Sequence, residues 1–470
     1  MILPRTTVTE EGWRDAIERL AAGRATLLGL WGDVPSVHLA LFDEAKGDIE
    51  ILTLACVDGK YPSVGAKHPP AIRLERAIRD LHKLDAVGSP DTRPWLVHTD
   101  GPYEFLPAEG EALHQIAVGP VHAGIIEPGH FRFTANGEFV VRLEQKLGYV
   151  HKGIEGLMAG ASLADAAKLA ARTSGDSTVA YGYAFALAAE TALQVTPPPR
   201  AVYLRALMAE LERLANHFGD IGAICNDASF ALMHAQTGIL RECTLRTAEV
   251  CFGHRLMMDA IVPGGVAQDI GTGGVTAVQN LLAEIRRAFP QLIALYDNTA
   301  SLQDRTVTTG IVKPDYARQF GAGGYVGRAS GRNFDARRAL AYAPYDALTF
   351  DVPVLDAGDV NARVWIRIRE VEQSLALIDQ IIANLPDGDI KTALPPSGGV
   401  GEGLALVEAF RGDVLVWLRL DAQGRVARCH LRDASWFQWP LLETAVEGNI
   451  VADFPLCNKS FNCSYSGHDL

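Results

Sequence analysis

The pattern of hydrophobic and polar positions changes character near residue 117. Before that point, Thr7-Val8-Thr9-Glu10 has capping-box spacing and predicts a helix that runs to about Ala22. Apolar runs predict strands over residues 25–31, 37–42 and 49–56, and a charged helix is predicted over 72–84. These short elements predict a small α+β domain within residues 1–110.

After residue 117 the spacing becomes mainly helical. A strand pair with a long loop is predicted around 119–133, and Ser162, with Asp165 three residues later, is placed to cap a helix. Pro197-Pro198-Pro199 ends the next helical run, and the following helix carries one apolar stripe of Leu204, Leu207, Leu211, Leu214 and Phe218. Further elements are predicted as helices over 240–259, 275–296 and 363–385 and a hairpin over 414–432. Residues 111–470 should therefore form a larger helical bundle flanked by small sheets.

Composition narrows the class of protein. The 470 residues carry a formal charge of −13, which argues against nucleic-acid binding. No run of about 18 uncharged apolar residues is present, and Met1–Arg5 lacks the basic start of a signal peptide. The seven cysteines form no C-x-x-C pair, which predicts free thiols. A folded chain without a membrane span is expected.

One polar stretch, Arg172-Thr173-Ser174-Gly175-Asp176-Ser177, interrupts two Ala/Leu-rich helical runs. It resembles the first metal-ligand motif of the nickel–iron hydrogenase large subunit, in which Arg is followed by Cys-Gly-x-Cys. The tail Asn462–Leu470 resembles the end of the same subunit. Ser174, Ser177, Ser464 and Gly467 stand at the four cysteine positions. Nickel and iron need soft thiolate ligands there, so the resemblance implies a retained scaffold without its metal site. A simpler interpretation is that Ser174 and Ser177 cap a helix.

Further segments widen the resemblance to nearly the whole chain. The superfamily shared by nickel–iron hydrogenases and the 49-kDa subunit of respiratory complex I matches, in order, residues 148–155, 212–222, 263–266, 329–331 and 453–455 with the tail. Gly88-Ser89-Pro90-Asp91-Thr92-Arg93 resembles the end of the 30-kDa subunit, whose pattern is Gly-His-Pro-Asp-x-Arg. The chain is thus similar to cysteine-less relatives of energy-converting, membrane-bound hydrogenases (group 4), with a 30-kDa-like docking domain fused in front.

The resemblance to complex I makes quinone a candidate ligand, but this sequence departs from both quinone-binding motifs of that family. There the motif Arg-x-Asp-Tyr supplies a tyrosine to the quinone head group, whereas Ser174 and Gly175 occupy the last two positions here. The loop pattern Gly-Pro-x-His-x-x-x-His is matched by His122, while the second histidine falls near Pro128. His130 is close but out of register. The resemblance therefore leaves quinone as one candidate and weakens it.

Polar residues from several segments should cluster around the vacated cavity. The candidate residues for its chemistry are His122, His130, Tyr149, His151, Glu155, Arg172 and Asp176, with Glu127 beside them. Histidine titrates near neutral pH and suits proton transfer. The alternative is a satisfied polar network that only holds loops together.

A separate set of charges lies on one helix. Glu210, Arg213, His217 and Asp220 recur at i, i+3, i+7 and i+10, on a face distinct from the leucine stripe. The position of this helix inside the family's bundle favours a buried ion network, and a solvated face would show the same spacing.

The resemblance implies a peripheral subunit of a complex I-like or energy-converting membrane complex on the cytoplasmic face of the inner membrane. It would pair with a small iron–sulfur subunit that carries a 4Fe–4S cluster and with antiporter-like membrane subunits, and would bind no metal cofactor itself. Its cavity would accept a quinone or another small redox or protonatable molecule. The alternative is a non-catalytic scaffold between the iron–sulfur subunit and the membrane arm. The missing cysteines argue against an active hydrogenase.

Overall fold

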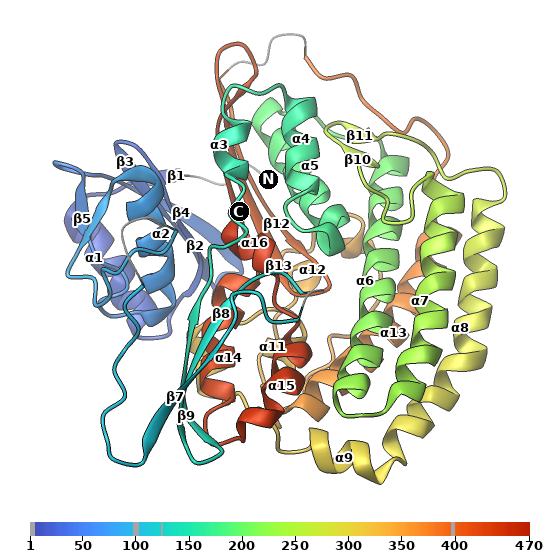
Figure 1. The fold of residues 1–470 in the computed structure, drawn as a ribbon. Helices are drawn as coiled ribbons and strands as arrows, with labels where there is room; N and C mark the ends of the chain where they lie inside the picture. Colours follow the sequence, from blue (N-terminus) through green and yellow to red (C-terminus); the bar gives the residue numbers. More distant parts are fainter. Residues whose placement is uncertain (1–4, 97–102, 124–125, 396–399) are drawn as a thin grey trace.

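The computed structural model describes residues 5–96, 103–123, 126–395 and 400–470. Its first part is a four-stranded sheet of order β1-β4-β3-β2, covered on one face by two helices (Figure 1). The elements are β1 (Arg5–Thr7), α1 (Glu10–Ala21), β2 (Thr26–Asp33), β3 (Ser36–Asp43), β4 (Asp48–Ala55), β5 (Lys60–Pro62), η1 (Pro69–Ala71), α2 (Ile72–His82) and β6 (Asp85–Val87). β1 pairs parallel to β4, and the other pairs of this sheet are antiparallel.

The predicted elements of this part are confirmed within about two residues. Thr9 caps α1, because its hydroxyl accepts a hydrogen bond from the Gly12 amide at 3.3 Å. β2 is buried along nearly its whole length, since Leu30 faces the helices while Leu28 and Trp31 face the C-terminal sheet. Burial on both faces explains why this strand has a continuous apolar run.

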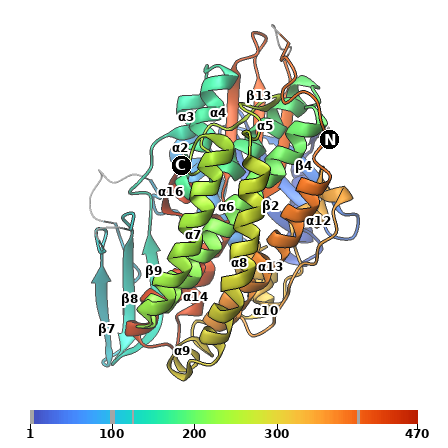
Figure 2. The same ribbon diagram turned by 90° about the vertical axis from the view of Figure 1, so that its right-hand side faces the viewer.

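The larger part is a helical bundle in which α6, α7, α8 and α13 pack side by side (Figures 1 and 2). Its helices are α3 (Ile154–Met158), α4 (Leu163–Ala171), η2 (Gly175–Ser177), α5 (Thr178–Leu193), α6 (Pro199–Asp227), α7 (Ala231–Phe252), α8 (Gly274–Asp297), α9 (Ala300–Thr306) and α13 (Val360–Ala383). The predicted leucine stripe of α6 is completely buried, and Ser162 caps α4 as expected. α7 is a correction to the predicted helix over 240–259. It begins at Ala231 and ends at Phe252, where Gly253 takes a left-handed φ of 73°.

Three small sheets flank the bundle. They are formed by β7 (Leu113–Val118), β8 (His130–Asn136) and β9 (Phe139–Lys146); by β10 (Ile261–Val262) and β11 (Gly265–Val266); and by β12 (Glu402–Glu408), β13 (Asp413–Leu420) and β14 (Val426–Arg432). The hairpin predicted over 414–432 is confirmed as β13–β14, and β12 extends it into a three-stranded sheet. The α+β class is confirmed, whereas the domain boundary at residue 110 stays a prediction.

The C-terminal sheet holds the N-terminal sheet against the bundle. Arg432 donates to the carbonyl oxygen of Leu28 at 2.6 Å, and Arg419 pairs with Asp33 at 2.8 Å. Short elements complete the chain: α10 (Pro314–Gln319), α11 (Gly324–Arg328), α12 (Ala336–Ala339), η3 (Tyr345–Ala347), α14 (Ser435–Ala445), η4 (Val451–Asp453), α15 (Phe454–Phe461) and α16 (Tyr465–Asp469). All seven cysteines are free thiols. Among the described residues, no helix is long and apolar enough to cross a membrane.

A cleft at the positions of the missing cysteines

A cleft of about 520 Å³ opens where the loop before α5 meets the C-terminal tail. The β7–β8 loop contributes His122 to its wall, the loop before α5 contributes Asp176, and the turn between β12 and β13 contributes Arg411. Asn462 and Tyr465 come from the tail. Four segments far apart in the sequence therefore build one site.

Three of the four expected cysteine positions are joined by direct hydrogen bonds. The hydroxyl oxygens of Ser174 and Ser464 lie 2.9 Å apart across 290 residues of sequence. The Ser464 hydroxyl also accepts a hydrogen bond from the Gly467 amide at 2.8 Å. The expected convergence of the loop and the tail is present in this structure.

The fourth position, Ser177, is joined to the others through Arg411. The Arg411 guanidinium donates to the Ser177 hydroxyl at 3.1 Å, to the Asp176 carboxylate at 2.5 Å and to the Asn462 carbonyl oxygen at 2.6 Å. Burial alone would raise the pKa of Asp176, but the adjacent guanidinium outweighs it and holds that pKa below its ordinary value. Asp176 and Arg411 therefore form an ion pair in the wall of the cleft.

This donor set does not fit a nickel–iron centre. Such a centre needs thiolates, and the three serine hydroxyls here are already engaged in hydrogen bonds to Asp176, Arg411 and one another. The Arg411 guanidinium, fully charged and buried at this point, would also repel a cation. The four positions lie together in this structure, but hydroxyls, a backbone amide and a guanidinium take the place of thiolates.

The interpretation that Ser174 and Ser177 cap a helix is wrong. Neither hydroxyl makes a capping hydrogen bond to η2 or α5. The carboxylate of Glu212 on α6 does so instead, by accepting from the amides of Val179 at 2.7 Å and Ala180 at 3.2 Å. Burial raises the pKa of Glu212 to about 8, and the nearby charge of Asp176 adds to the rise.

Two of the seven candidate residues, His122 and Asp176, line the cleft, as does Glu127. The Nε2 atom of His122 is buried and finds no hydrogen-bond partner among the described residues. Burial lowers the pKa of His122, which keeps the ring neutral near pH 7. Glu127 accepts a hydrogen bond from the Ser466 amide at 3.1 Å and so ties the β7–β8 loop to the tail.

The other five candidates do not line the cleft. His130 packs against the ring of Phe105 with 4.8 Å between centroids, and His151 Nδ1 lies 2.7 Å from the Asp469 carbonyl oxygen. Tyr149 is partly exposed on the segment before α3. Of these three residues, His151 contacts the tail directly, and none lines the cavity.

Glu155 and Arg172 make structural contacts instead. Glu155 pairs with Arg428 at 2.7 Å and His430 at 2.8 Å, and so fastens α3 to β14. Arg172 turns outward from the end of α4 and pairs with Asp259 at 2.6 Å, with 43% of its side chain exposed. The expectation that Arg172 faces the cavity is therefore wrong, because its charge is satisfied at the surface.

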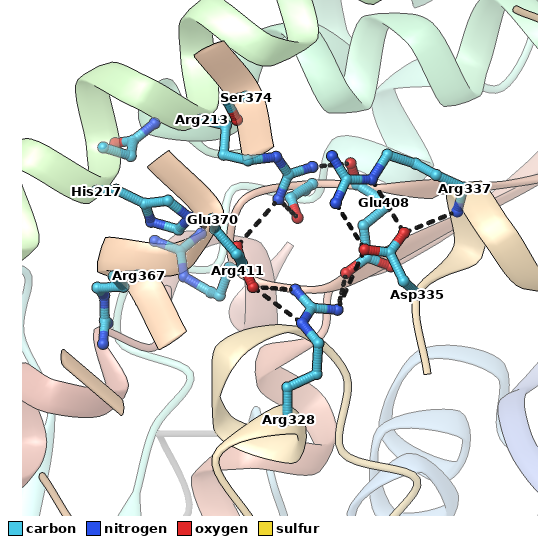
Figure 3. A network of polar contacts seen from close by, with 12 residues as sticks. Arg213, His217, Arg328, Asp335, Arg337, Arg367, Glu370, Ser374, Glu408 and Arg411 are labelled. Atoms are coloured by element: carbon cyan, nitrogen blue, oxygen red, sulfur yellow. Dashed lines mark hydrogen bonds and ion pairs between the residues drawn. The ribbon is translucent and has the colours of Figure 1, made fainter. Parts of the chain in front are cut away.

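The charged face predicted on α6 is buried in an ion network, as expected. Glu210, Arg213 and His217 are at most 1% exposed. Arg213 approaches Glu370 of α13 at 3.6 Å, and His217 Nε2 lies 2.7 Å from the same carboxylate (Figure 3). Asp220 binds Arg367 at 3.1 Å and the side-chain amide of Asn462 at 2.9 Å, which brings this helix to the rim of the cleft.

Most partners of that helix were not recognisable from the sequence. Glu210 pairs with Arg337 and Arg213 with Glu370. The network then continues through residues that also lie more than 100 positions further along the chain, namely Arg328, Asp335 and Glu408. Arg411 was missed for the same reason. A usable signal was the charged sequence Glu408-Ala-Phe-Arg-Gly-Asp413 between two apolar strands, since charges in a buried turn need partners.

Comparison with known proteins places the chain in a family. The family described as "Respiratory-chain NADH dehydrogenase, 49 Kd subunit" matches residues 228–398 and 394–469. Formate hydrogenlyase subunit 5 of Escherichia coli K12 is 30% identical over 87% of this chain and 77% of its own length. Hydrogenase-4 component G of the same organism is 29% identical over 92% and 80%. An NADH-quinone oxidoreductase subunit of Roseiflexus sp. RS-1 is 31% identical over 72% and 94%.

The chain therefore belongs to the family of the 49-kDa subunit of respiratory-chain NADH dehydrogenase, and it is also similar to hydrogenase components. The expected resemblance is confirmed.

Proposed function

We propose that this chain is a peripheral subunit of a complex I-like membrane oxidoreductase complex, related to energy-converting hydrogenases and metal-free at the former nickel–iron site. In this role it helps to couple electron transfer to ion translocation. Family membership supports the proposal, since the relatives are named as subunits or components of hydrogenases and NADH-quinone oxidoreductases.

The observation that carries the metal-free assignment is the hydrogen-bonded group of Ser174, Ser464 and Gly467 with the Arg411–Asp176 ion pair. Hydroxyls and a guanidinium suit an organic ligand better than nickel. A cleft of about 520 Å³ falls in the range for small-molecule sites. We propose that it accepts a quinone or another small redox or protonatable molecule, with neutral His122 as a hydrogen-bonding group in its wall.

The proposed partners rest on the resemblance to complex I and the energy-converting hydrogenases, and they are supported by relatives that are named as subunits of larger complexes. A small iron–sulfur subunit, similar to the 20-kDa subunit of complex I, would carry a 4Fe–4S cluster beside the cleft. Antiporter-like membrane subunits would anchor the assembly on the cytoplasmic face of the inner membrane. This chain would itself bind no metal cofactor.

Tagged purification from gently solubilised native membranes tests the assembly. We expect an iron–sulfur subunit and antiporter-like proteins in fixed ratio, with no nickel by elemental analysis. Stoichiometric nickel would refute the metal-free site, and a chain that purifies alone would refute the assembly.

A second candidate function is a non-catalytic scaffold in the same complex. It is favoured by the five candidate residues that lie outside the cleft in structural contacts. Variants H122A and D176N in the cleft, with R172A and H151A as controls outside it, separate the two functions. If the complex assembles and all four variants keep full activity, the scaffold is correct.

A further inference from the structure

The buried network around α6 contains a closed ring of charges (Figure 3). Around it, acids and arginines alternate in the order Glu210, Arg213, Glu370, Arg328, Asp335 and Arg337, and Arg337 returns to Glu210 at 2.9 Å. Two groups are attached to the ring. His217 lies on Glu370, and Glu408 lies on Arg328. All eight side chains are at most 3% exposed.

The charges in this network do not balance. Four carboxylates face three guanidiniums, which leaves a formal charge of −1 when His217 is neutral. An uncompensated charge is very costly in a dry interior, and a buried group escapes that cost by taking up a proton. The network therefore has a reason to hold one proton.

The geometry indicates which group takes it. Asp335 and Glu408 both approach the same nitrogen, Nη1 of Arg328, at 3.5 and 2.8 Å. Two carboxylates at one site repel each other, so one of them stays protonated. Asp335 also has a two-point contact with Arg337, at 3.0 and 2.6 Å, which stabilises its ionised form. Within the described part of the chain, the Glu408 carboxylate contacts Arg328 and the Ala336 amide, each at 2.8 Å, and lacks a two-point contact of this kind. Glu408 is therefore the better proton acceptor.

His217 is a poorer place for the proton. Its Nδ1 atom is buried and finds no hydrogen-bond partner among the described residues. Protonation would place a second N–H there without an acceptor, which costs free energy. Burial accordingly lowers the pKa of His217, although Glu370 opposes the shift.

Other charges face Glu408 from neighbouring elements. The Arg332 guanidinium is buried nearby and donates a hydrogen bond to the Ala322 carbonyl oxygen. Its positive charge favours an ionised Glu408. Asp413 opposes this, although its own charge is paired with Arg432 at 2.5 Å. Arg213 also lowers the pKa of Glu408, and the Tyr342 hydroxyl accepts from the Glu408 amide.

We propose that Glu408 is a buried proton-binding site that shares one exchangeable proton with Asp335 and responds to charge in the cleft. Burial and the repulsion of Asp335 raise the pKa of Glu408 to about 7, so both protonation states are accessible near neutral pH.

The link to the cleft is the tight turn between β12 and β13. Glu408 enters the network at one end of this turn, and Arg411, three residues later, reaches Asp176 in the cleft wall. Arg213 donates to the carbonyl oxygens of Glu408 and Ala409 at 3.0 and 3.1 Å and holds the turn. A negative charge added beside Arg411 would offset the positive potential that Arg411 creates at Glu408, and would so favour protonation of Glu408. The link between Glu408 and the cleft rests on the proposed cleft function. The proton site at Glu408 does not depend on any ligand in the cleft.

Infrared spectroscopy of the purified full chain tests the site. A protonated carboxyl has a C=O stretch that separates from the carboxylate bands, and 13C-glutamate shifts that stretch to lower frequency. We expect wild-type protein to show such a glutamate band at neutral pH that disappears with a midpoint near 7. No shifting band, or none that titrates in this range, would overturn the proposal without mutagenesis.

Two variants assign the band. E408Q should remove it, whereas E212Q, the matched control at another buried glutamate with a raised pKa, should leave it. Glutamine mimics the neutral acid, so E408Q should fold. D176N removes the partner of Arg411 and should lower the midpoint by about half a unit. Glu212, whose pKa is raised to about 8, should contribute a separate band that E212Q removes. A band with a midpoint near 7 that persists in E408Q overturns the site, and an unchanged midpoint in D176N overturns the link.

These outcomes are separable from those of the proposed function. The infrared test needs neither partner subunits nor a cleft ligand, so its failure would leave the assembly untouched. Failure of the membrane purification would in turn leave the proton site standing.

Discussion

The ion network and the cleft are two polar regions of one molecule, and they share α6 and the turn between β12 and β13. In the network, charged groups lie in a buried closed ring in which each ring member contacts two groups of opposite sign. In the cleft, His122 Nε2 lacks a hydrogen-bond partner among the described residues, and Asp176 keeps 38% of its side chain exposed. The difference indicates that the network specifies the fold while the cleft is available to a ligand.

The two regions also differ in what their polar groups contribute to stability. Removing one member of a buried ion network leaves its partners uncompensated, which is far more costly than losing a half-exposed contact. Substitutions should therefore destabilise the network strongly and the cleft weakly, and unfolding measurements can test that order.

The largest effect should come from Arg328, which contacts Glu370, Glu408 and Asp335. We expect R328M to lower the free energy of unfolding by about 3–5 kcal/mol or to prevent folding. R172M, at the exposed pair with Asp259, should cost less than about 1 kcal/mol. Denaturant unfolding measures both, and equal losses would contradict the contrast between buried and exposed pairs.

A smaller effect should separate two glutamates within the network. Glu370 is ionised, since Arg328 and His217 outweigh burial and hold its pKa well below the ordinary value. E370Q should therefore cost about 2–4 kcal/mol at pH 7, because three neighbouring groups lose their charge partner. E408Q should cost less than about 1 kcal/mol, since glutamine replaces an acid that already holds a proton about half of the time at this pH. A larger loss for E408Q than for E370Q would reverse this assignment.

Glu155 provides a pH-dependent test outside both regions. Burial would raise its pKa, but Arg428 and His430 outweigh it and hold the folded-state pKa far below the ordinary value of 4.5. Its contribution to stability is thus present above about pH 4.5 and is lost as the pH falls toward the folded-state pKa. E155Q should be less stable than wild type at pH 7, and the two should converge in acid. A constant difference between pH 7 and pH 3 would show that the pairing is not electrostatic.

The smallest effect should come from the cleft serines. A double-mutant cycle of S174A and S464A should give a coupling energy of about 1 kcal/mol, the value of one buried neutral hydrogen bond. H122A should change stability by less than about 0.5 kcal/mol, because no hydrogen bond to its Nε2 is lost. A coupling energy near zero would indicate that the loop and the tail do not meet as described.

The sequence predicted the fold better than it predicted the site. Hydrophobic spacing located α6, α8 and the β13–β14 hairpin, because burial imposes a local period. The charged face of α6 was found for the same reason. The ion-pair partners of that face were not predicted, because they lie in distant segments and no local sequence pattern shows which segments meet.

Arg172 and Glu212 show where local reasoning fails. Arg172 was assigned to the cavity from its motif, but it ends α4 and reaches Asp259, whose position depends on the loop after α7. The cap of α5 was assigned to the adjacent serines, and the structure supplies it from Glu212 on another helix. In both places a tertiary contact replaces the local one.

The bond between the N-terminal sheet and the C-terminal hairpin has a further consequence for assembly. Arg432 and Arg419 join strands that lie about 400 residues apart, at separations of 404 and 386 positions. Because the N-terminal sheet and the hairpin belong to one chain, their docking is an intramolecular step at high effective concentration. It does not depend on the concentration of a second protein. The C-terminal sheet, whose β12–β13 turn carries Glu408 and Arg411, is thus supported at a fixed ratio of one N-terminal sheet to one site. Separate subunits could reach this ratio only if they were synthesised in equal amounts.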